Sequence, residues 1–263
     1  MTNTKELVLY TLEDGVAVLQ LNQAESRNAM TPEMGQALAS AIERASSEAK
    51  AIVLLGSAKA FSAGANLKSS RMDNISADID MGEKLEEIYN PLLLKIRELP
   101  IPLISGIRGA AAGVGCSIAL MGDIIIAGKS GFFLQAFCHV GLVPDGGSAY
   151  ILSRSVGRIR AMELMLLGER YPAERAYQDG LVTKVVEDQD VQSTAIEYAK
   201  RLADGPSLAL KMIRQSAWAA LDSDFETQLL LDRKNQKTAG RTADFVEGVA
   251  AFRERRKAKF NGK

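Results

Sequence analysis

The sequence predicts an α/β fold in which helices cover a parallel sheet. Residues 51–55 (AIVLL) form a continuous apolar run of strand length, as expected for a strand buried on both faces. The segment before it repeats apolar residues at helical spacing, and the chain returns to strand at residues 101–105. With 263 residues and 47% hydrophobic content, the chain can bury a large core as one α/β domain or as a domain with a C-terminal appendage.

The first elements along the chain are a hairpin and a helix. Residues 6–12 and 16–21 are β-rich runs separated by a short turn, and residues 22–28 form a polar loop. Thr31 is then a helix N-cap ahead of Pro32 at the first helical position. Together with the strand that follows, these segments predict a βαβ unit.

A turn, a loop and a helix come next. Residues 59–67 contain small side chains that leave the backbone N–H of Ala65 accessible. Residues 68–80 carry few apolar side chains and are expected to form a mobile loop or a plain surface loop. Residues 85–99 have helical spacing, with a bend or a fresh start near Pro91.

Residues 104–147 are predicted to build a pocket from backbone. The segment runs from an apolar strand through glycines and alanines into a small-residue helix that begins near Val114. Free N–H groups at the start of a helix can stabilise negative charge. At the far end, a VPDGG turn holds one carboxylate, Asp145. Close packing alone explains the small residues, and Asp145 has the alternative role of a turn former.

The second half of the chain is predicted to be mostly helical. Short strands are expected at residues 124–127, 132–135 and 181–186. Helices are expected at residues 159–167, 172–178, 190–202, 208–221, 225–233 and 243–255.

Composition excludes several classes of function. Lys plus Arg and Asp plus Glu are 32 each, so the net charge favours neither nucleic acid nor an anionic membrane. The N-terminus lacks a signal-like apolar core, and no apolar run approaches the ~20 residues that span a bilayer, so we expect a cytoplasmic protein. Cys116, Cys138 and His139 are too few and wrongly spaced for a zinc site, so no metal is expected.

Several stretches give the chain a family resemblance over essentially its whole length. They are NQAESRNAM, KAFSAGANL, ISGIRGAAAGVGCSIALMGDIIIAG, VGLVPDGGSAYILSRSVG and AFRERRKAKF. In this order and spacing they resemble the enoyl-CoA hydratase/isomerase (crotonase) superfamily. The resemblance implies a ClpP-like fold of repeated ββα turns forming two nearly perpendicular sheets. It also implies a core over residues 1–200 and a helical region over 201–263 that assembles homotrimers, often paired into hexamers.

The resemblance also implies a coenzyme A thioester as substrate, with no separate cofactor. By position, the oxyanion hole falls on the backbone N–H groups of Ala65 and Val114, beside Gly64 and Gly113, which agrees with the two turns described above. Other positions match groups that hold CoA or the acyl chain in relatives: Ser26, Arg27, Ala63, Lys68, Phe137 and, reached from a neighbouring subunit, Arg255 and Phe260.

Departures from the family pattern indicate the chemistry. The two glutamates that activate water in hydratases are replaced by Ser117 and Phe137, neither of which can do acid/base work at neutral pH. Asp145 stands where enoyl-CoA isomerases carry their acidic residue, and the PDGG turn is most similar to the ring-epoxide isomerase branch. The sequence therefore predicts an acyl-CoA isomerase with Asp145 as the single base. Phe137 and Phe133 are expected to keep the site dry.

Alternatives stay open at this point. They are an enoyl-CoA hydratase using other groups, an aryl-CoA dehalogenase-like enzyme with Asp145 as nucleophile, and a non-catalytic relative that binds CoA or RNA. Neutral charge weighs against RNA. The acyl group is also open, since it can be a chain from fatty acid metabolism or a ring from phenylacetate degradation.

Overall fold

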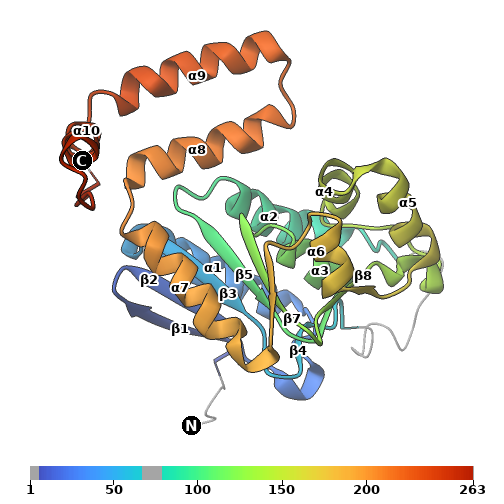
Figure 1. The fold of residues 1–263 in the computed structure, drawn as a ribbon. Helices are drawn as coiled ribbons and strands as arrows, with labels where there is room; N and C mark the ends of the chain where they lie inside the picture. Colours follow the sequence, from blue (N-terminus) through green and yellow to red (C-terminus); the bar gives the residue numbers. More distant parts are fainter. Residues whose placement is uncertain (1–5, 67–78, 263) are drawn as a thin grey trace.

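A computed structural model describes residues 6–66 and 79–262 of the chain. Two β-sheets and the helices around them form the body of the molecule, and the last three helices project from it (Figure 1). The α/β class and the two-sheet architecture are confirmed. We call the projecting helices the C-terminal arm, which consists of α8 (Ser207–Ala220), α9 (Phe225–Ala239) and α10 (Ala243–Glu254).

The larger sheet has the strand order β1-β2-β3-β5-β7-β10. The predicted hairpin is present as the antiparallel pair β1 and β2, and each later pair of neighbours is parallel. The strands span Val8–Glu13 (β1), Val16–Leu21 (β2), Ala51–Leu55 (β3), Leu103–Ile107 (β5), Ile124–Gly128 (β7) and Lys184–Val186 (β10). All five residues of β3 are buried, as the AIVLL run predicts.

Helices cover both faces of this sheet. On one face, α7 (Val191–Ala203) packs Ala195 and Ala199 into a cluster with Val53 of β3. On the other face lies α1 (Pro32–Glu48), whose buried side chains join the main core. The Thr31 side chain accepts a hydrogen bond from the backbone N–H of Met34 at 3.2 Å, so the predicted N-cap is confirmed.

The smaller sheet carries the segments around the predicted site. Its order is β4-β6-β8-β9, with strands at Ala60–Ser62 (β4), Ala110–Ala112 (β6), Phe132–Leu134 (β8) and Tyr171–Pro172 (β9). Strand β6 is the alanine run. The sequence predicted that backbone segments approach each other closely there, but it did not predict a strand. Alanine has little preference for strands, so pairing with β4 and β8 defines this one. Helix α3 (Gly113–Ala119) follows it directly.

The helix before Pro100 is interrupted where the sequence predicted. A π-helical turn at Leu85–Tyr89 leads into α2 (Asn90–Arg97), which has Pro91 in its first turn. The remaining helices of the body are α4 (Ser148–Ser155), α5 (Gly157–Leu167) and α6 (Ala173–Gln178). Most of the expected loop at residues 68–80 lies outside the described residues.

Several predicted boundaries were wrong by two or more residues, among them those of β5, β10 and α9. Residues 101–102 precede β5 rather than belonging to it. The strand expected at 181–186 is reduced to its last three residues, because the N–H groups of Leu181 and Val182 bond to the carbonyl of Ala176 at the end of α6. Helix α9 continues six residues past Arg233, although the apolar periodicity that predicted it ends there. In this added stretch the Asn235 side chain donates a hydrogen bond to the Ser216 hydroxyl of α8 at 2.9 Å, which holds the two helices together.

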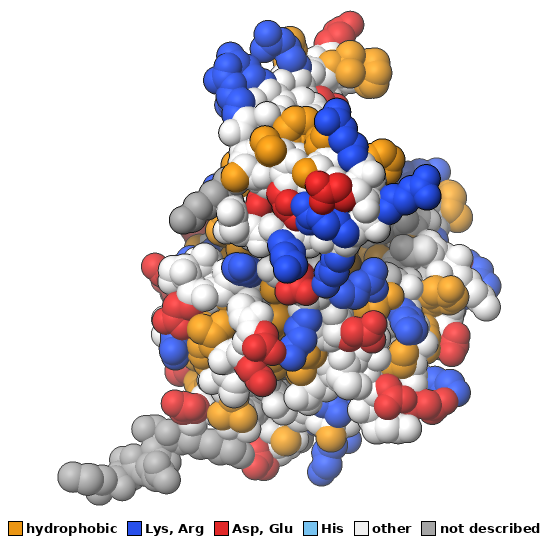
Figure 2. All heavy atoms as spheres, turned by 60° about the vertical axis from the view of Figure 1, so that its left-hand side comes forward, with side chains coloured by type: hydrophobic (Ala, Val, Ile, Leu, Met, Phe, Trp, Pro, Cys, Tyr) orange, Lys and Arg blue, Asp and Glu red, His pale blue; other side chains and the backbone are white. Residues whose placement is uncertain are grey.

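The C-terminal arm exposes many large apolar side chains. Figure 2 shows hydrophobic side chains among Lys and Arg at the top of the molecule, where the arm projects. The exposed set includes Phe225, Leu229, Leu230, Phe245, Val246 and Phe252. Within the described ranges, no helix combines the length and apolar character needed to cross a bilayer.

Candidate active site

Two glycine turns bring the predicted oxyanion segments into backbone contact. Gly64 has φ +85° and Gly113 has φ +49°, a region that favours glycine. A Cβ added to Gly64 would lie 2.9 Å from the carbonyl oxygen of Ala112, and one added to Gly113 would lie 3.7 Å from Cα of Gly64. The turn after β4 and the start of α3 therefore lie directly side by side.

The backbone N–H of Ala65 is left out of the local hydrogen bonding. Met30 and Ala65 form an isolated parallel bridge in which the Met30 N–H bonds to Gly64 O and the Asn66 N–H bonds to Met30 O. Among the described residues, no acceptor takes the N–H of Ala65. Val114 lies in the first turn of α3, where N–H groups have no intrahelical acceptor. Two N–H groups are thus available from neighbouring segments.

Asn28 holds the Ala65 turn in place, a role that was not predicted from the sequence. Its buried side chain donates to the carbonyls of Ala60 and Phe61, both at 3.1 Å, and accepts the N–H of Gln23 at 2.8 Å. The Ser62 hydroxyl donates to the Asn28 carbonyl at 2.8 Å. A positive φ of 53° at Asn28 suits asparagine. The sequence signal that could have indicated this role is the position of Asn28 at the end of the polar loop of residues 22–28.

Asp145 lies in the turn between the short helix after β8 and α4. Its carboxylate is half-buried, and among the described residues its Oδ1 atom is buried without a hydrogen-bond partner. Burial raises the pKa of Asp145 to about 6 from an ordinary value of 3.8. A carboxylate that titrates near neutral pH can both remove and return a proton.

Two serines fix the backbone of this turn. The Ser117 hydroxyl donates to the carbonyl of Asp145 at 3.0 Å, and the Ser148 hydroxyl donates to the same oxygen at 2.8 Å. Both serines are fully buried. In this chain Ser117, on α3, holds the Asp145 turn. This role was not predictable from the sequence, because the two residues are 28 positions apart in the chain.

The two phenylalanines expected near the site differ in location. Phe137 is half-buried, and a Cβ on Gly113 would meet its ring at 3.6 Å, so this ring lies beside the Gly113 turn. Phe133 is buried in the main core, on a strand that pairs with β6 and β9. Only Phe137 is positioned to limit water at the turn.

The expected CoA-binding residues are only partly brought together. The Ala63 N–H donates to the carbonyl of Arg27 at 2.9 Å, which joins the segment of Ser26 and Arg27 to the Ala65 turn. The Ser26 hydroxyl bonds within its own turn, to Gln23 O at 3.1 Å. Lys68 lies outside the described residues.

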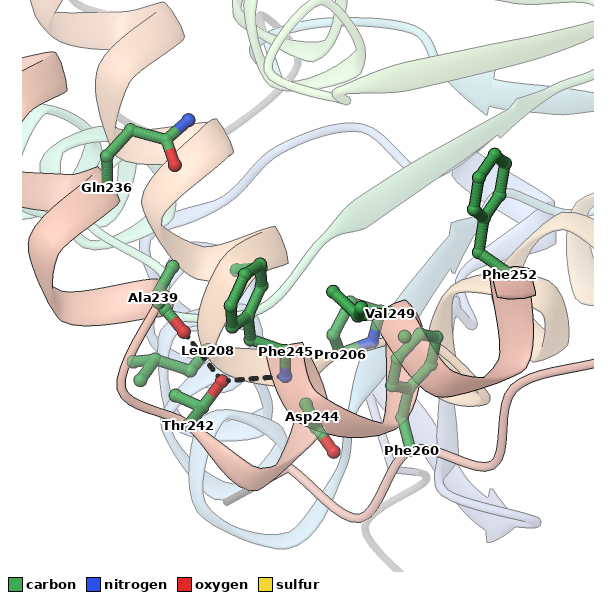
Figure 3. Close-up of a pocket in the computed structure, with 13 residues that line it drawn as sticks. Pro206, Leu208, Gln236, Ala239, Thr242, Asp244, Phe245, Val249, Phe252 and Phe260 are labelled. Carbon is green, nitrogen blue, oxygen red and sulfur yellow. Dashed lines mark hydrogen bonds between the residues drawn. The ribbon is translucent and has the colours of Figure 1, made fainter. Parts of the chain in front are cut away.

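Arg255 and Phe260 follow α10, the last helix of the C-terminal arm, which projects from the body of the molecule (Figure 1). Figure 3 shows Phe260 packed against α10 near Val249, in an apolar hollow of the arm. The Asp244 carboxylate fixes the segment that follows α10, because it accepts hydrogen bonds from the backbone N–H groups of Asn261 at 2.7 Å and Gly262 at 3.0 Å. Within one chain, these two residues do not join the cluster.

The described part of the chain holds no group of three or more His, Cys, Asp or Glu side chains arranged to bind a metal ion. The cluster of Ala65, Val114 and Asp145 offers two backbone donors and one carboxylate. Such a set suits proton transfer next to a carbonyl whose oxygen becomes negatively charged.

Comparison with known proteins shows the family to which the chain is similar. The family model described as "Enoyl-CoA hydratase/isomerase" matches residues 11–263. A 1,2-epoxyphenylacetyl-CoA isomerase of Escherichia coli (strain K12) is 39% identical over 98% of this chain and 99% of its own length. A Rhodobacter capsulatus protein named "Probable enoyl-CoA hydratase" is 39% identical over 97% of this chain and 98% of its own length. The solved structure of an enoyl-CoA hydratase from Polaromonas sp. JS666 has 32% identity and a TM-score of 0.90, covering 97% of this chain and 99% of that chain.

Proposed function

The chain belongs to the enoyl-CoA hydratase/isomerase family, and from this premise we propose that it is an acyl-CoA isomerase that works through a thioester enolate. The observation that carries the proposal is the Asp145 carboxylate, half-buried, with a pKa near 6 and one oxygen free of hydrogen bonds among the described residues. A base with these properties is ready to take a proton from carbon at neutral pH.

The proposed reaction moves one proton between two carbons. Asp145 removes a proton from a carbon next to the thioester carbonyl, or conjugated with it, and the electron pair moves onto the carbonyl oxygen. The N–H groups of Ala65 and Val114 hold that oxygen as it gains charge. Asp145 then returns the proton to a different carbon, so the double bond shifts or a strained ring opens and rearranges. No water is consumed.

The surroundings of Ser117 support isomerisation over hydration. A Cβ on Gly146 would lie 2.7 Å from the Ser117 Cβ, so the Asp145–Gly146 turn fills the space around this side chain. A glutamate at 117 has no room while the turn stays in place. Among the described residues, no second carboxylate contributes to the pKa of Asp145. A single carboxylate suffices for proton relocation, whereas a hydratase of this family uses two.

Coenzyme A is proposed to bind along the segments that Arg27 and Ala63 join, with Ser26, Gly64 and Lys68 nearby and with Arg255 and Phe260 supplied by a neighbouring subunit. Phe137 is proposed to lie against the acyl group beside Gly113. These assignments come from the family resemblance and from the Ala63 to Arg27 hydrogen bond.

The test is a panel of CoA thioesters with straight, branched and ring-containing acyl groups. Double-bond migration is followed by ultraviolet absorbance, and water addition is followed separately by a mass increase of one water. We expect migration or ring rearrangement without gain of water. Rapid hydration of crotonyl-CoA would instead assign the chain to the hydratases, and loss of a ring halogen would assign it to the dehalogenase-like enzymes.

A further inference from the structure

Gln135 is a buried polar residue beside the Asp145 turn that takes no part in the proposed reaction so far. It follows β8 directly and is 2% exposed. Its side-chain oxygen lies 3.3 Å from the Ser148 hydroxyl, which donates to it. Within residues 6–66 and 79–262, its side-chain nitrogen Nε2 is buried without a hydrogen-bond partner. A buried amide nitrogen without an acceptor costs free energy, so the position of this donor needs an explanation.

The Ser148 hydroxyl connects Gln135 to Asp145. This hydroxyl has one proton, and two acceptors lie within reach of it: the backbone carbonyl of Asp145 at 2.8 Å and the Gln135 oxygen at 3.3 Å. Because one proton makes one good hydrogen bond, the two acceptors compete for it. The longer contact is also the one that leaves Nε2 of Gln135 unsatisfied.

Rotation of the Gln135 amide by half a turn removes this conflict. The two ends of a glutamine amide have nearly the same shape, so their hydrogen-bond partners decide which end points where. After the rotation, Nε2 donates to the Ser148 oxygen, and the Ser148 proton is left to the Asp145 carbonyl. The Gln135 oxygen then faces the other group that interacts with this amide, the buried thiol of Cys116. Burial raises the pKa of this thiol to about 12, so it keeps its proton at neutral pH and can donate weakly.

The turn that carries Asp145 depends on hydrogen bonds because two glycines follow the carboxylate. Gly146 and Gly147 have φ values of +58° and +72°, a region that glycine enters freely but also leaves freely. The Asp145 carbonyl accepts from the backbone N–H of Ser148 at 3.1 Å, in addition to the hydroxyls of Ser117 and Ser148. Whatever directs the Ser148 proton to this carbonyl therefore stabilises the turn.

We propose that Gln135 is a positioning residue whose amide N–H donates to the Ser148 hydroxyl, which in turn donates to the Asp145 carbonyl and fixes the turn that carries the base. Gln135 acts through Ser148 and does not touch the substrate. The effect on catalysis rests on the proposed function, whereas the hydrogen bonds themselves do not depend on it.

Gln135→Met and Ser148→Ala, alone and combined, test the proposal. Methionine is about as long as glutamine and fills the buried space without a donor, and Gln135→Leu is a second apolar variant. Gln178→Met, at an exposed glutamine on α6, is the matched control. Two quantities are measured on each protein. One is the pair of kcat and KM on the best thioester of the panel, and the other is the hydrogen-exchange rate of the backbone N–H of residue 148 by NMR. Because this N–H bonds to the Asp145 carbonyl, its exchange reports opening of the turn without any substrate.

Gln135→Met should lower kcat about three- to tenfold with KM nearly unchanged, and it should speed exchange of this N–H by a similar factor, as loss of one net hydrogen bond predicts. In the Ser148→Ala background, the same substitution should change neither quantity further, because Gln135 has no hydroxyl left to act on. Gln178→Met should change neither quantity.

Equal effects of Gln135→Met with and without the Ser148 hydroxyl would give Gln135 a packing role only and overturn the proposal. Unchanged exchange in both single variants of Gln135 would overturn it as well. If the wild type isomerises no thioester of the panel, the proposed function fails, and the exchange rates still decide whether Gln135 fixes the turn through Ser148.

Discussion

The Ser117 hydroxyl donates a hydrogen bond of 3.0 Å to the backbone carbonyl of Asp145, across 28 residues of sequence. Ser117 lies on α3, whose first turn also carries the N–H of Val114. One short helix therefore positions both the proposed base and one proposed oxyanion donor. Their relative placement depends on this contact and on the parallel bond from Ser148.

Ser117→Ala should lower kcat/KM by about 5- to 10-fold with little change in KM, since about 1 kcal/mol of positioning is lost while Ser148 still holds the carbonyl. Steady-state kinetics on the best thioester of the panel checks this. Because both hydroxyls share one acceptor, Ser117→Ala combined with Ser148→Ala should be non-additive. Ser46→Ala, which removes an exposed hydroxyl bonded to Glu43 O, is the matched control. Unchanged kcat in both single variants would refute the positioning role.

Asp145→Asn should reduce isomerisation by at least ~100-fold, because asparagine fills the same space but accepts no proton. In the wild type the base must be ionised, so kcat/KM should be flat above pH ~7 and fall about tenfold per pH unit below the pKa of about 6. The residual rate of the variant should lack this pH dependence. The test is a pH profile of kcat/KM measured on both proteins. A wild-type rate that stays flat down to pH 4 would contradict the role of Asp145 as the base.

The same substitution should stabilise the fold at pH 7. Because burial raises the folded-state pKa of Asp145 from 3.8 to about 6, the folded chain binds more protons than the unfolded chain between these values, and wild-type stability falls as pH rises through them. Asp145→Asn removes this cost, which is about 1 to 2 kcal/mol after allowance for solvent screening. Urea unfolding should show the gain at pH 7 and its disappearance near pH 4. Equal stability changes at both pH values would contradict the raised pKa.

Arg214 joins the C-terminal arm to the body. Its buried guanidinium bonds Asp123 at 2.8 Å and the carbonyls of Arg97, Leu99 and Ile96 at 2.6 to 2.9 Å. Arg214→Met leaves the partly exposed Asp123 carboxylate and three backbone carbonyls without their donor, and it should cost about 2 to 4 kcal/mol in the free energy of unfolding. The exposed pair of Lys200 and Asp14 is the control, since Lys200→Ala should cost about 0 to 1 kcal/mol. Similar losses of unfolding free energy in the two variants would argue against Arg214 as the residue that joins the arm to the body.

The apolar surface of the arm should be buried between subunits, because side chains such as Leu230 and Phe252 are 71% and 85% exposed in the single chain. Sedimentation should give a trimer or hexamer. Leu230→Glu with Phe252→Glu should shift the assembly toward monomer, whereas Lys234→Glu on the same arm should not. A stable monomer of the wild type at micromolar concentration would contradict this prediction.

The sequence alone determined the features that depend on neighbouring residues. The AIVLL strand, the Thr31 cap with Pro32, and the interruption before α2 were all predictable, because apolar periodicity and turn chemistry act over a few residues. Family membership was also predictable, from the order of several motifs along the whole chain. The same local signals failed at β6, because only its partners make three alanines a strand.

The tertiary structure decided the relations between distant segments. That the Ala65 N–H is left out of the bridge to Met30 and that Ser117 holds Asp145 both depend on how separate elements pack. Spacing along a chain gives no measure of such distances. The raised pKa of Asp145 likewise follows from burial, which exists only once the surrounding segments have come together.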